Sequence, residues 1–126
     1  MTTDLESPPP AGAFEPTGSV EPQARYRLHA DICKVLTDSK RLMLIEALRH
    51  GSRSVGALAA EAGLSLANAS QHLAVLRHAG LVETRRSGTT VHYRLTEPEL
   101  VAACDLIDRI VNRRLGLAEP EGIACA

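Results

Sequence analysis

Aromatic residues are nearly missing from this chain of 126 residues, which has one Phe, two Tyr and no Trp. A core must therefore come from Leu, Val, Ile and Ala, and a folded part of about 95 residues supports only a modest one. Cysteine is scarce too, with three residues and no Cys-x-x-Cys pair. Together with the lack of a Ser/His/Asp arrangement and of a phosphate-binding glycine loop, this argues against an enzyme.

Long apolar runs are also missing, since no segment approaches the ~18 continuous apolar residues of a membrane span. The first residues lack the basic start and apolar run of a signal peptide. We therefore expect a cytoplasmic protein that has no membrane partner. Residues 1–22 are rich in proline and poor in apolar periodicity, which predicts a disordered tail. Residues 23–116 are expected to form one domain, and 117–126 a flexible tail.

Charge is unevenly distributed along the chain. The net charge is only −1, but residues 23–96 carry 11 Lys and Arg against 5 Asp and Glu, whereas both flanks are acidic. A basic central segment is typical of a protein that binds nucleic-acid phosphates. The alternative is a solvated basic surface without a partner.

Apolar periodicity predicts four helices in the first two thirds of the chain. The first covers about 23–36, and the second covers 39–49 with Asp38 or Thr37 as its N-cap. Ser54 is the expected N-cap of a third helix that ends at Gly63. A fourth begins after Ser65 and stops at Gly80.

Two strands and a last helix complete the pattern. The strands are expected at 82–86 and 90–95, joined at Ser87-Gly88. The last helix should continue to about residue 115, with Thr96 as N-cap, Pro98 in the first turn and Glu99 completing a capping box. We therefore predict a mainly α fold with a small β-hairpin, a winged helix-turn-helix.

The fourth helix presents polar residues at its start, while its Leu and Ala residues repeat at core spacing. Asn and Gln amides can bond adenine bidentately, Ser hydroxyls suit phosphates or base edges, and a helix N-terminus favours anions. Arginines at the hairpin tip are suited to phosphate or minor-groove contact. The expected double-stranded-DNA-binding residues are Ser65, Asn68, Ser70, Gln71, His72, Arg85, Arg86 and Thr89. The alternative is that these polar residues only cap the helix and keep its surface solvated.

Three stretches of sequence resemble the ArsR/SmtB family of bacterial winged-helix repressors. They are LTDSKRLMLIEAL, LSLANASQHLAVLRHAGLV and the wing RRSGTTVHYRL. The resemblance covers about residues 25–115. It implies a homodimer through the first and last helices, an inverted-repeat operator, and repression relieved by an inducer. It also assigns Ser70, Gln71 and His72 to DNA-contacting positions.

The chain departs from the metal sites of that family. Ser54 and Gly56 stand where its arsenic and cadmium sensors have a Cys-x-Cys pair. The last helix has Asp105 and Asp108 but lacks the histidines of the zinc and nickel sensors, and carboxylates alone are poor transition-metal ligands. We therefore expect neither a resident metal nor another cofactor.

The cysteines allow more than one kind of inducer. Cys33 and Cys104 lie on the two helices that the resemblance assigns to the dimer interface, which favours thiol-based sensing of an oxidant or reactive sulfur species. Family members with such pairs usually have the first cysteine in the second helix, near Glu46 here. The alternatives are a soft ion such as arsenite bound by Cys33 and Cys104, with or without Cys125, or no sensing by cysteine. A winged helix used for protein–protein contact is a further alternative.

Overall fold

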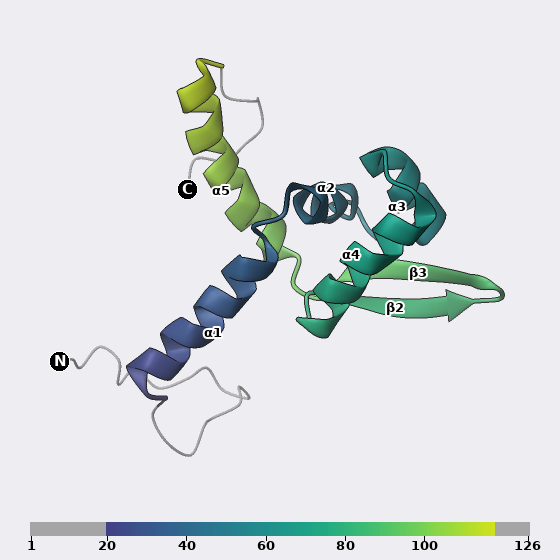
Figure 1. The fold of residues 1–126 in the computed structure, drawn as a ribbon, viewed down its shortest axis with the longest axis horizontal. Coiled ribbons are helices and arrows are strands. Elements are labelled where there is room, and N and C mark those ends of the chain that lie inside the picture. Colours follow the sequence, from purple (N-terminus) through teal and green to yellow (C-terminus); the bar gives the residue numbers. More distant parts are fainter. Residues whose placement is uncertain (1–19, 118–126) are drawn as a thin grey trace. The chain divides into compact units, whose positions relative to one another are not determined.

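The computed structural model describes residues 20–117, so all but residues 20–22 and 117 of the predicted tails, 1–22 and 117–126, lie outside the described residues. The chain divides into two compact units within its first helix, after Asp31. The elements are α1 (Pro22–Val35), α2 (Ser39–Ala47), β1 (Arg53–Ser54), α3 (Val55–Ala62), α4 (Leu66–His78), β2 (Val82–Ser87), β3 (Thr90–Leu95) and α5 (Glu99–Leu115) (Figure 1).

Helix α2 begins where the sequence predicts and ends earlier. The Asp38 carboxylate accepts hydrogen bonds from the backbone amides of Lys40 (2.8 Å) and Arg41 (3.3 Å), which makes Asp38 rather than Thr37 the N-cap. The prediction that α2 continues to Arg49 is wrong by two residues. The reason is that the backbone at Leu48 leaves the α conformation, with φ −92° and ψ 5°.

Helices α3 and α4 form the predicted helix-turn-helix. The Ser54 hydroxyl accepts a hydrogen bond from the Ala57 amide, and the Ser65 hydroxyl accepts one from the Asn68 amide, both at 3.1 Å. Between the helices Gly63 has φ 68°, a left-handed conformation that suits glycine and ends α3. Both helix starts are therefore confirmed.

One aliphatic core holds α2, α3 and α4 together. Its fully buried side chains are nearly all leucine, as expected for a chain so poor in aromatic residues: Leu44, Ile45, Leu48, Leu58, Leu73 and Leu76. Leu81 and Val82 at the start of the wing and Val101 of α5 join the same cluster, and Tyr93 packs against it. The wing and α5 are thus anchored to the helix-turn-helix by their first residues.

The wing is a three-stranded antiparallel sheet with the order β1-β3-β2. The short strand β1, which the sequence analysis missed, pairs Arg53 with Tyr93 of β3. Ser87 pairs with Thr90, so the turn is Gly88-Thr89 and the predicted Ser87-Gly88 turn lies one residue too early. Gly88 has φ 64°, which fits the glycine at the first central position of a type II′ turn.

Helix α5 begins without the predicted capping box. Its N-cap residue is Pro98, and no side chain caps it. The Thr96 hydroxyl instead donates a hydrogen bond to the Gly80 carbonyl at 2.6 Å, and the Thr96 amide bonds the Leu81 carbonyl at 3.0 Å. Thr96 therefore closes the base of the wing against the end of α4, and its hydroxyl no longer serves the helix.

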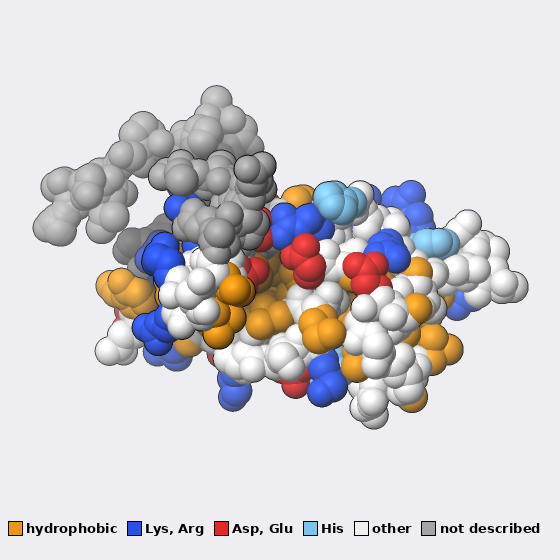
Figure 2. All heavy atoms as spheres, turned by 90° about the horizontal axis from the view of Figure 1, so that it is seen from above, with side chains coloured by type: hydrophobic (Ala, Val, Ile, Leu, Met, Phe, Trp, Pro, Cys, Tyr) orange, Lys and Arg blue, Asp and Glu red, His pale blue; other side chains and the backbone are white. Residues whose placement is uncertain are grey.

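Large apolar side chains remain exposed at several places. Figure 2 shows hydrophobic side chains open to solvent among charged ones on one face of the molecule. On α5 the exposed apolar side chains are Leu106, Ile107, Ile110, Val111 and Leu115, each at least 44% exposed. Several large apolar side chains exposed on one helix are typical of an interaction surface.

Candidate nucleic-acid interface

The start of α4 is polar and open to solvent. Asn68, Ser70 and Gln71 are exposed, whereas Ala69 and Leu73 of the same two turns are fully buried. Ser65 is exposed too, and its hydroxyl is engaged by the Asn68 amide as the helix cap. The burial of one side fixes the helix, so that the opposite side presents two amides and a hydroxyl to solvent at a helix N-terminus.

His72 differs from these neighbours because its side chain is only 20% exposed. Its Nδ1 atom lies 3.4 Å from a terminal nitrogen of Arg41 and 4.0 Å from the Asp38 carboxylate. The imidazole thus faces the start of α2 as well as the polar side of α4. Among the predicted DNA-binding residues, His72 is the one whose side chain lies against other side chains of the protein, those of Arg41 and Asp38.

The Asp38 carboxylate lies beside His72 and also caps α2. Burial alone would raise the pKa of this carboxyl. Hydrogen bonds from the Lys40 and Arg41 amides lower it, and so do the nearby His72 and the Arg41 guanidinium. Together they outweigh burial, so the pKa lies below its ordinary value. The carboxylate is therefore ionised at neutral pH, when it caps α2 beside the start of α4.

The wing carries cations toward its tip. Arg85 and Arg86 on β2 and Thr89 in the turn are exposed, and the hairpin extends beyond α4 with its turn far from α5 (Figure 1). Arg94 pairs across the strands with Glu83. Within residues 20–117 neither Arg85 nor Arg86 has an ion pair or a hydrogen-bonded side chain, so both guanidinium groups are available to an anion.

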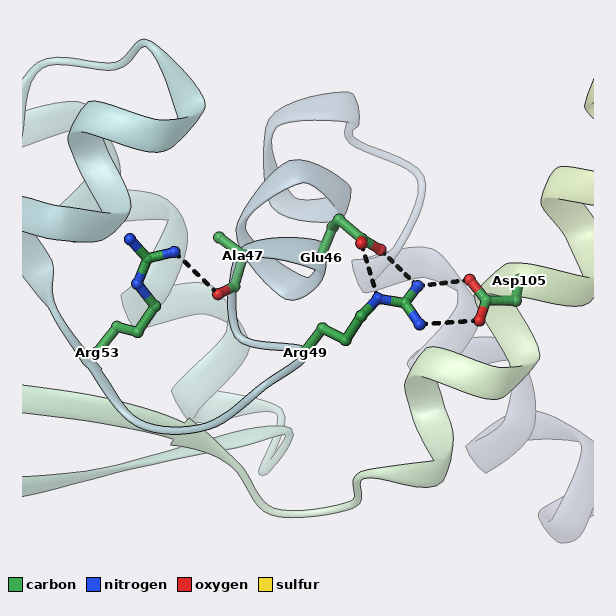
Figure 3. Close-up of polar contacts among 5 residues, drawn as sticks. All are labelled: Glu46, Ala47, Arg49, Arg53 and Asp105. Carbon is green, nitrogen blue, oxygen red and sulfur yellow. Dashed lines mark hydrogen bonds and ion pairs between the residues drawn. The ribbon is translucent and has the colours of Figure 1, made fainter. Parts of the chain in front are cut away.

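A second polar cluster joins α2 to α5. The Arg49 guanidinium donates to both carboxylate oxygens of Glu46, at 2.7 Å each, and to those of Asp105, at 2.6 and 3.0 Å (Figure 3). This guanidinium holds the pKa of Asp105 below its ordinary value, and both carboxylates raise the pKa of Arg49. Arg53, also drawn in Figure 3, bonds the Ala47 carbonyl and pairs with Glu61.

The two described cysteines have different surroundings. Cys33 is exposed in the last turn of α1, and Cys104 is half-buried on α5; both are free thiols. Cys104 lines a groove of about 690 Å³ between α2 and α5. Burial raises the pKa of the Cys104 thiol, and the carboxylates of Asp108, Asp105 and Glu46 raise it further. Cys125 lies outside the described residues.

The described part of the chain offers neither a metal site nor a membrane-spanning helix. Across residues 20–117 no three His, Cys, Asp or Glu side chains gather closely enough to hold a metal ion. Nor does any helix in that range combine the length and apolar character that a membrane crossing requires.

Comparison with known proteins agrees with this geometry. The family model described as "Bacterial regulatory protein, arsR family" matches residues 38–84, from the cap of α2 into β2. An HTH-type transcriptional regulator of Mycobacterium tuberculosis is 34% identical over 105 residues, which is 79% of this chain and 92% of that protein.

Two solved structures are similar over most of the fold. One is a homodimeric winged helix-turn-helix DNA-binding domain from Mycobacterium bovis, with TM-score 0.66 and 31% identity, covering 79% of this chain and 93% of that one. The other is the transcriptional repressor BigR from Xylella fastidiosa, with TM-score 0.62 and 41% identity, covering 68% and 90%. The chain belongs to the ArsR family of winged-helix DNA-binding transcriptional regulators, which are not enzymes.

Proposed function

We propose that the chain is a homodimeric repressor that binds inverted-repeat operator DNA through α4 and the wing. The observation that carries the proposal is the exposed polar start of α4, which shares one compact unit with an arginine-bearing wing in a chain of the ArsR family. Such a regulator works where the chromosome is, so the cytoplasm remains the expected location.

Each contact type has a chemical match in duplex DNA. The amides of Asn68 and Gln71 suit adenine edges in the major groove, and the hydroxyl of Ser70 suits a base edge or a phosphate. Ser65 and His72 flank this surface, with His72 contributing the exposed edge of its ring. Phosphate contact is the role of the wing residues Arg85, Arg86 and Thr89.

The homodimer rests on the apolar side of α5. Leu106, Ile107 and Ile110 are exposed on α5 and lie opposite the side of the helix that lines the groove with α2, given the 100° between successive residues. Pairing this side with α5 of a second copy, with α1 beside it, would bury it. A two-fold dimer then brings two α4 helices to half-sites about 34–36 Å apart.

Fluorescence anisotropy tests the DNA contacts with a duplex selected from a random-sequence pool by the parent protein. Gln71→Ala is expected to lose about tenfold on the selected duplex and little on a scrambled one, because a base contact specifies sequence. Arg86→Ala is expected to weaken both duplexes alike and to reduce the salt slope by about 1. Arg94→Ala, whose guanidinium is already paired with Glu83, is the matched control.

The proposal fails if the parent selects no sequence, or if Gln71→Ala and Arg86→Ala both bind like Arg94→Ala. The direction of control is tested separately by transcription in vitro from a promoter that contains the selected sequence. Repression predicts less transcript when the protein is added, and more transcript would show an activator.

For the inducer we propose thiol chemistry that begins at the exposed Cys33. Its thiolate attacks one sulfur of a polysulfide or disulfide R–S–S–R′, so that a Cys33–S–S–R bond forms and R′S⁻ leaves. The Cys104 thiol then loses its proton and attacks the Cys33 sulfur, which forms a Cys33–Cys104 bridge and releases RS⁻. The two thiols are oxidised and the reagent is reduced to two thiolates. The bridge requires the two Cα atoms to come within about 7 Å.

Mass spectrometry after tetrathionate treatment of the full chain tests this chemistry, with DNA affinity measured in parallel. Modification of the parent should weaken binding at least about tenfold, the effect of about 1.4 kcal/mol between two dimer states. Cys33→Ser should not respond, and Cys125→Ser is the matched control that should respond fully. If Cys33→Ser responds like the parent, Cys33 is not the sensor.

A further inference from the structure

The end of α1, the start of α2 and the first turns of α4 meet at one side chain, Arg41. Its Nε donates a hydrogen bond to the Val35 carbonyl at 2.6 Å, and a terminal nitrogen lies 3.4 Å from Nδ1 of His72. Its own backbone amide donates to the Asp38 cap at 3.3 Å. We call Val35, Asp38, Arg41 and His72 the Arg41 junction. All four belong to the compact unit that starts at Ile32.

Arg41 completes the hydrogen bonding at the end of α1. A helix leaves its last carbonyls without intrahelical partners. Here the Cys33 carbonyl accepts from the Leu36 amide (2.9 Å), and the Lys34 carbonyl accepts from the Thr37 hydroxyl (2.7 Å). The Val35 carbonyl is left to the Arg41 guanidinium, whose positive charge also suits the negative end of a helix.

The same guanidinium fixes the imidazole of His72. The contact to Nδ1 is a hydrogen bond when that nitrogen is the acceptor, with the proton on Nε2. His72 follows Ser70 and Gln71 directly on α4, so holding its ring constrains the turn that carries those side chains, in addition to the buried Ala69 and Leu73. The two contacts come from different nitrogens of the planar Arg41 guanidinium, Nε and a terminal nitrogen, whereas a lysine has a single nitrogen from which to donate.

We propose that Arg41 is a positioning residue for DNA recognition. It holds the first turns of α4, through His72, against the end of α1 that carries Cys33. It therefore couples chemistry at Cys33 to the presentation of Ser70 and Gln71. The coupling to Cys33 rests on the proposed thiol switch. The positioning of α4 by Arg41 requires only that α4 recognises DNA.

A double-mutant cycle on DNA affinity tests the positioning. With the unmodified full chain and the selected duplex, Arg41→Ala and His72→Ala are each expected to weaken binding about tenfold, and the double variant at most about twofold more. The scrambled duplex should be bound almost as before. Lys40→Ala, which removes a neighbouring exposed charge, is the matched control and should weaken both duplexes alike.

Arg41→Lys separates positioning from simple charge. It keeps the positive charge but cannot reach Val35 and His72 together, so it should show the selectivity loss of Arg41→Ala and an unchanged salt slope. Circular dichroism verifies that each variant is folded. If Arg41→Ala does not fold, Arg41→Lys and His72→Ala decide the matter. Equal losses on both duplexes with a reduced salt slope, or additive effects in the cycle, would overturn the proposal.

Tetrathionate treatment tests the coupling, with modification of Cys33 verified by mass spectrometry. The parent should lose affinity on modification, whereas Arg41→Lys, modified to the same extent, should change less than about twofold. An equal response in both proteins would overturn the coupling. If the parent itself does not respond, the thiol switch is wrong and the coupling falls with it, while the double-mutant cycle still decides the positioning.

Discussion

At the residue scale, Arg49 connects two helices that are far apart in the sequence. Its side chain is 28% exposed, and its guanidinium donates to both oxygens of Glu46 and of Asp105, whose side chain is 22% exposed. Partial exclusion of water makes such a bidentate pair stronger than an ordinary surface ion pair. The pair sets how the base of α5 lies against α2.

Arg49→Ala is expected to lower the free energy of unfolding by about 1–3 kcal/mol, because two carboxylates lose their hydrogen-bond donors. Urea unfolding at pH 7 measures this, and Arg94→Ala on the more exposed wing pair is the control, at under about 1 kcal/mol. The folded-state pKa of Asp105 is lowered, so its contribution is present above the unfolded-state pKa near 4 and is lost as the pH falls through the folded-state value. A difference between parent and Arg49→Ala that is the same at pH 7 and pH 2 would contradict this account.

Cys104 offers a second test at this scale. Because burial and nearby carboxylates raise the pKa of its thiol, little thiolate forms at neutral pH and alkylation by iodoacetamide should be slow. Asp108→Asn removes the carboxylate that raises this pKa most and should speed the alkylation of Cys104 at pH 7.5. Mass spectrometry of the cysteine peptides measures both rates in one sample, with Cys33 as the internal control. An unchanged rate at Cys104 would show that the carboxylates do not control it.

At the element scale, Thr96 determines how the wing joins the helices. Thr96→Val keeps the shape of the side chain but leaves the Gly80 carbonyl without its hydroxyl donor, so we expect a loss of about 1 kcal/mol. Glu99→Ala is the control, and it should be nearly neutral, since the Thr96 hydroxyl is engaged at Gly80 instead of capping α5. Thermal unfolding of both variants measures the difference. A larger loss in Glu99→Ala than in Thr96→Val would show that the predicted capping box forms after all.

Local chemistry explains which elements were predictable. Ser54, Ser65 and Asp38 cap helices through bonds two or three residues away, and such short-range patterns are visible in the sequence. Strand β1 is only two residues long, too short to produce a pattern, and it exists because β3 pairs with it. The capping box failed at Thr96 because a partner sixteen residues away competes for the hydroxyl.

The candidate site likewise has one part that the sequence predicts and one part that it does not. The polar start of α4 and the wing arginines follow from helical spacing and the hairpin pattern, and both are exposed as expected. The Arg41 junction was missed because Arg41 and His72 are 31 residues apart and only the packing of α2 on α4 brings them together. The sequence carries no signal for this contact, because the burial of the His72 side chain, 20% exposed, is visible only in the structure.

At the scale of the whole molecule, α5 has two sides with different roles. The side with Val101, Cys104 and Asp108 faces the groove with α2, and the opposite side exposes Leu106, Ile107 and Ile110. A core of this size, built without large aromatic side chains, gains stability from burying that second side in a partner. Dimerisation would therefore support both the fold and the two-fold arrangement of the α4 helices.

Ile107→Asp is expected to disrupt the dimer, because a carboxylate at the centre of an apolar interface loses hydration without gaining a partner. Sedimentation velocity should show a monomer, and affinity for the selected inverted repeat should fall by at least about a hundredfold as the second half-site contact is lost. Asn112→Asp, which places the same charge on the groove side of the same helix, is the matched control and should stay dimeric. A dimeric Ile107→Asp that still binds the inverted repeat would exclude this side of α5 as the interface.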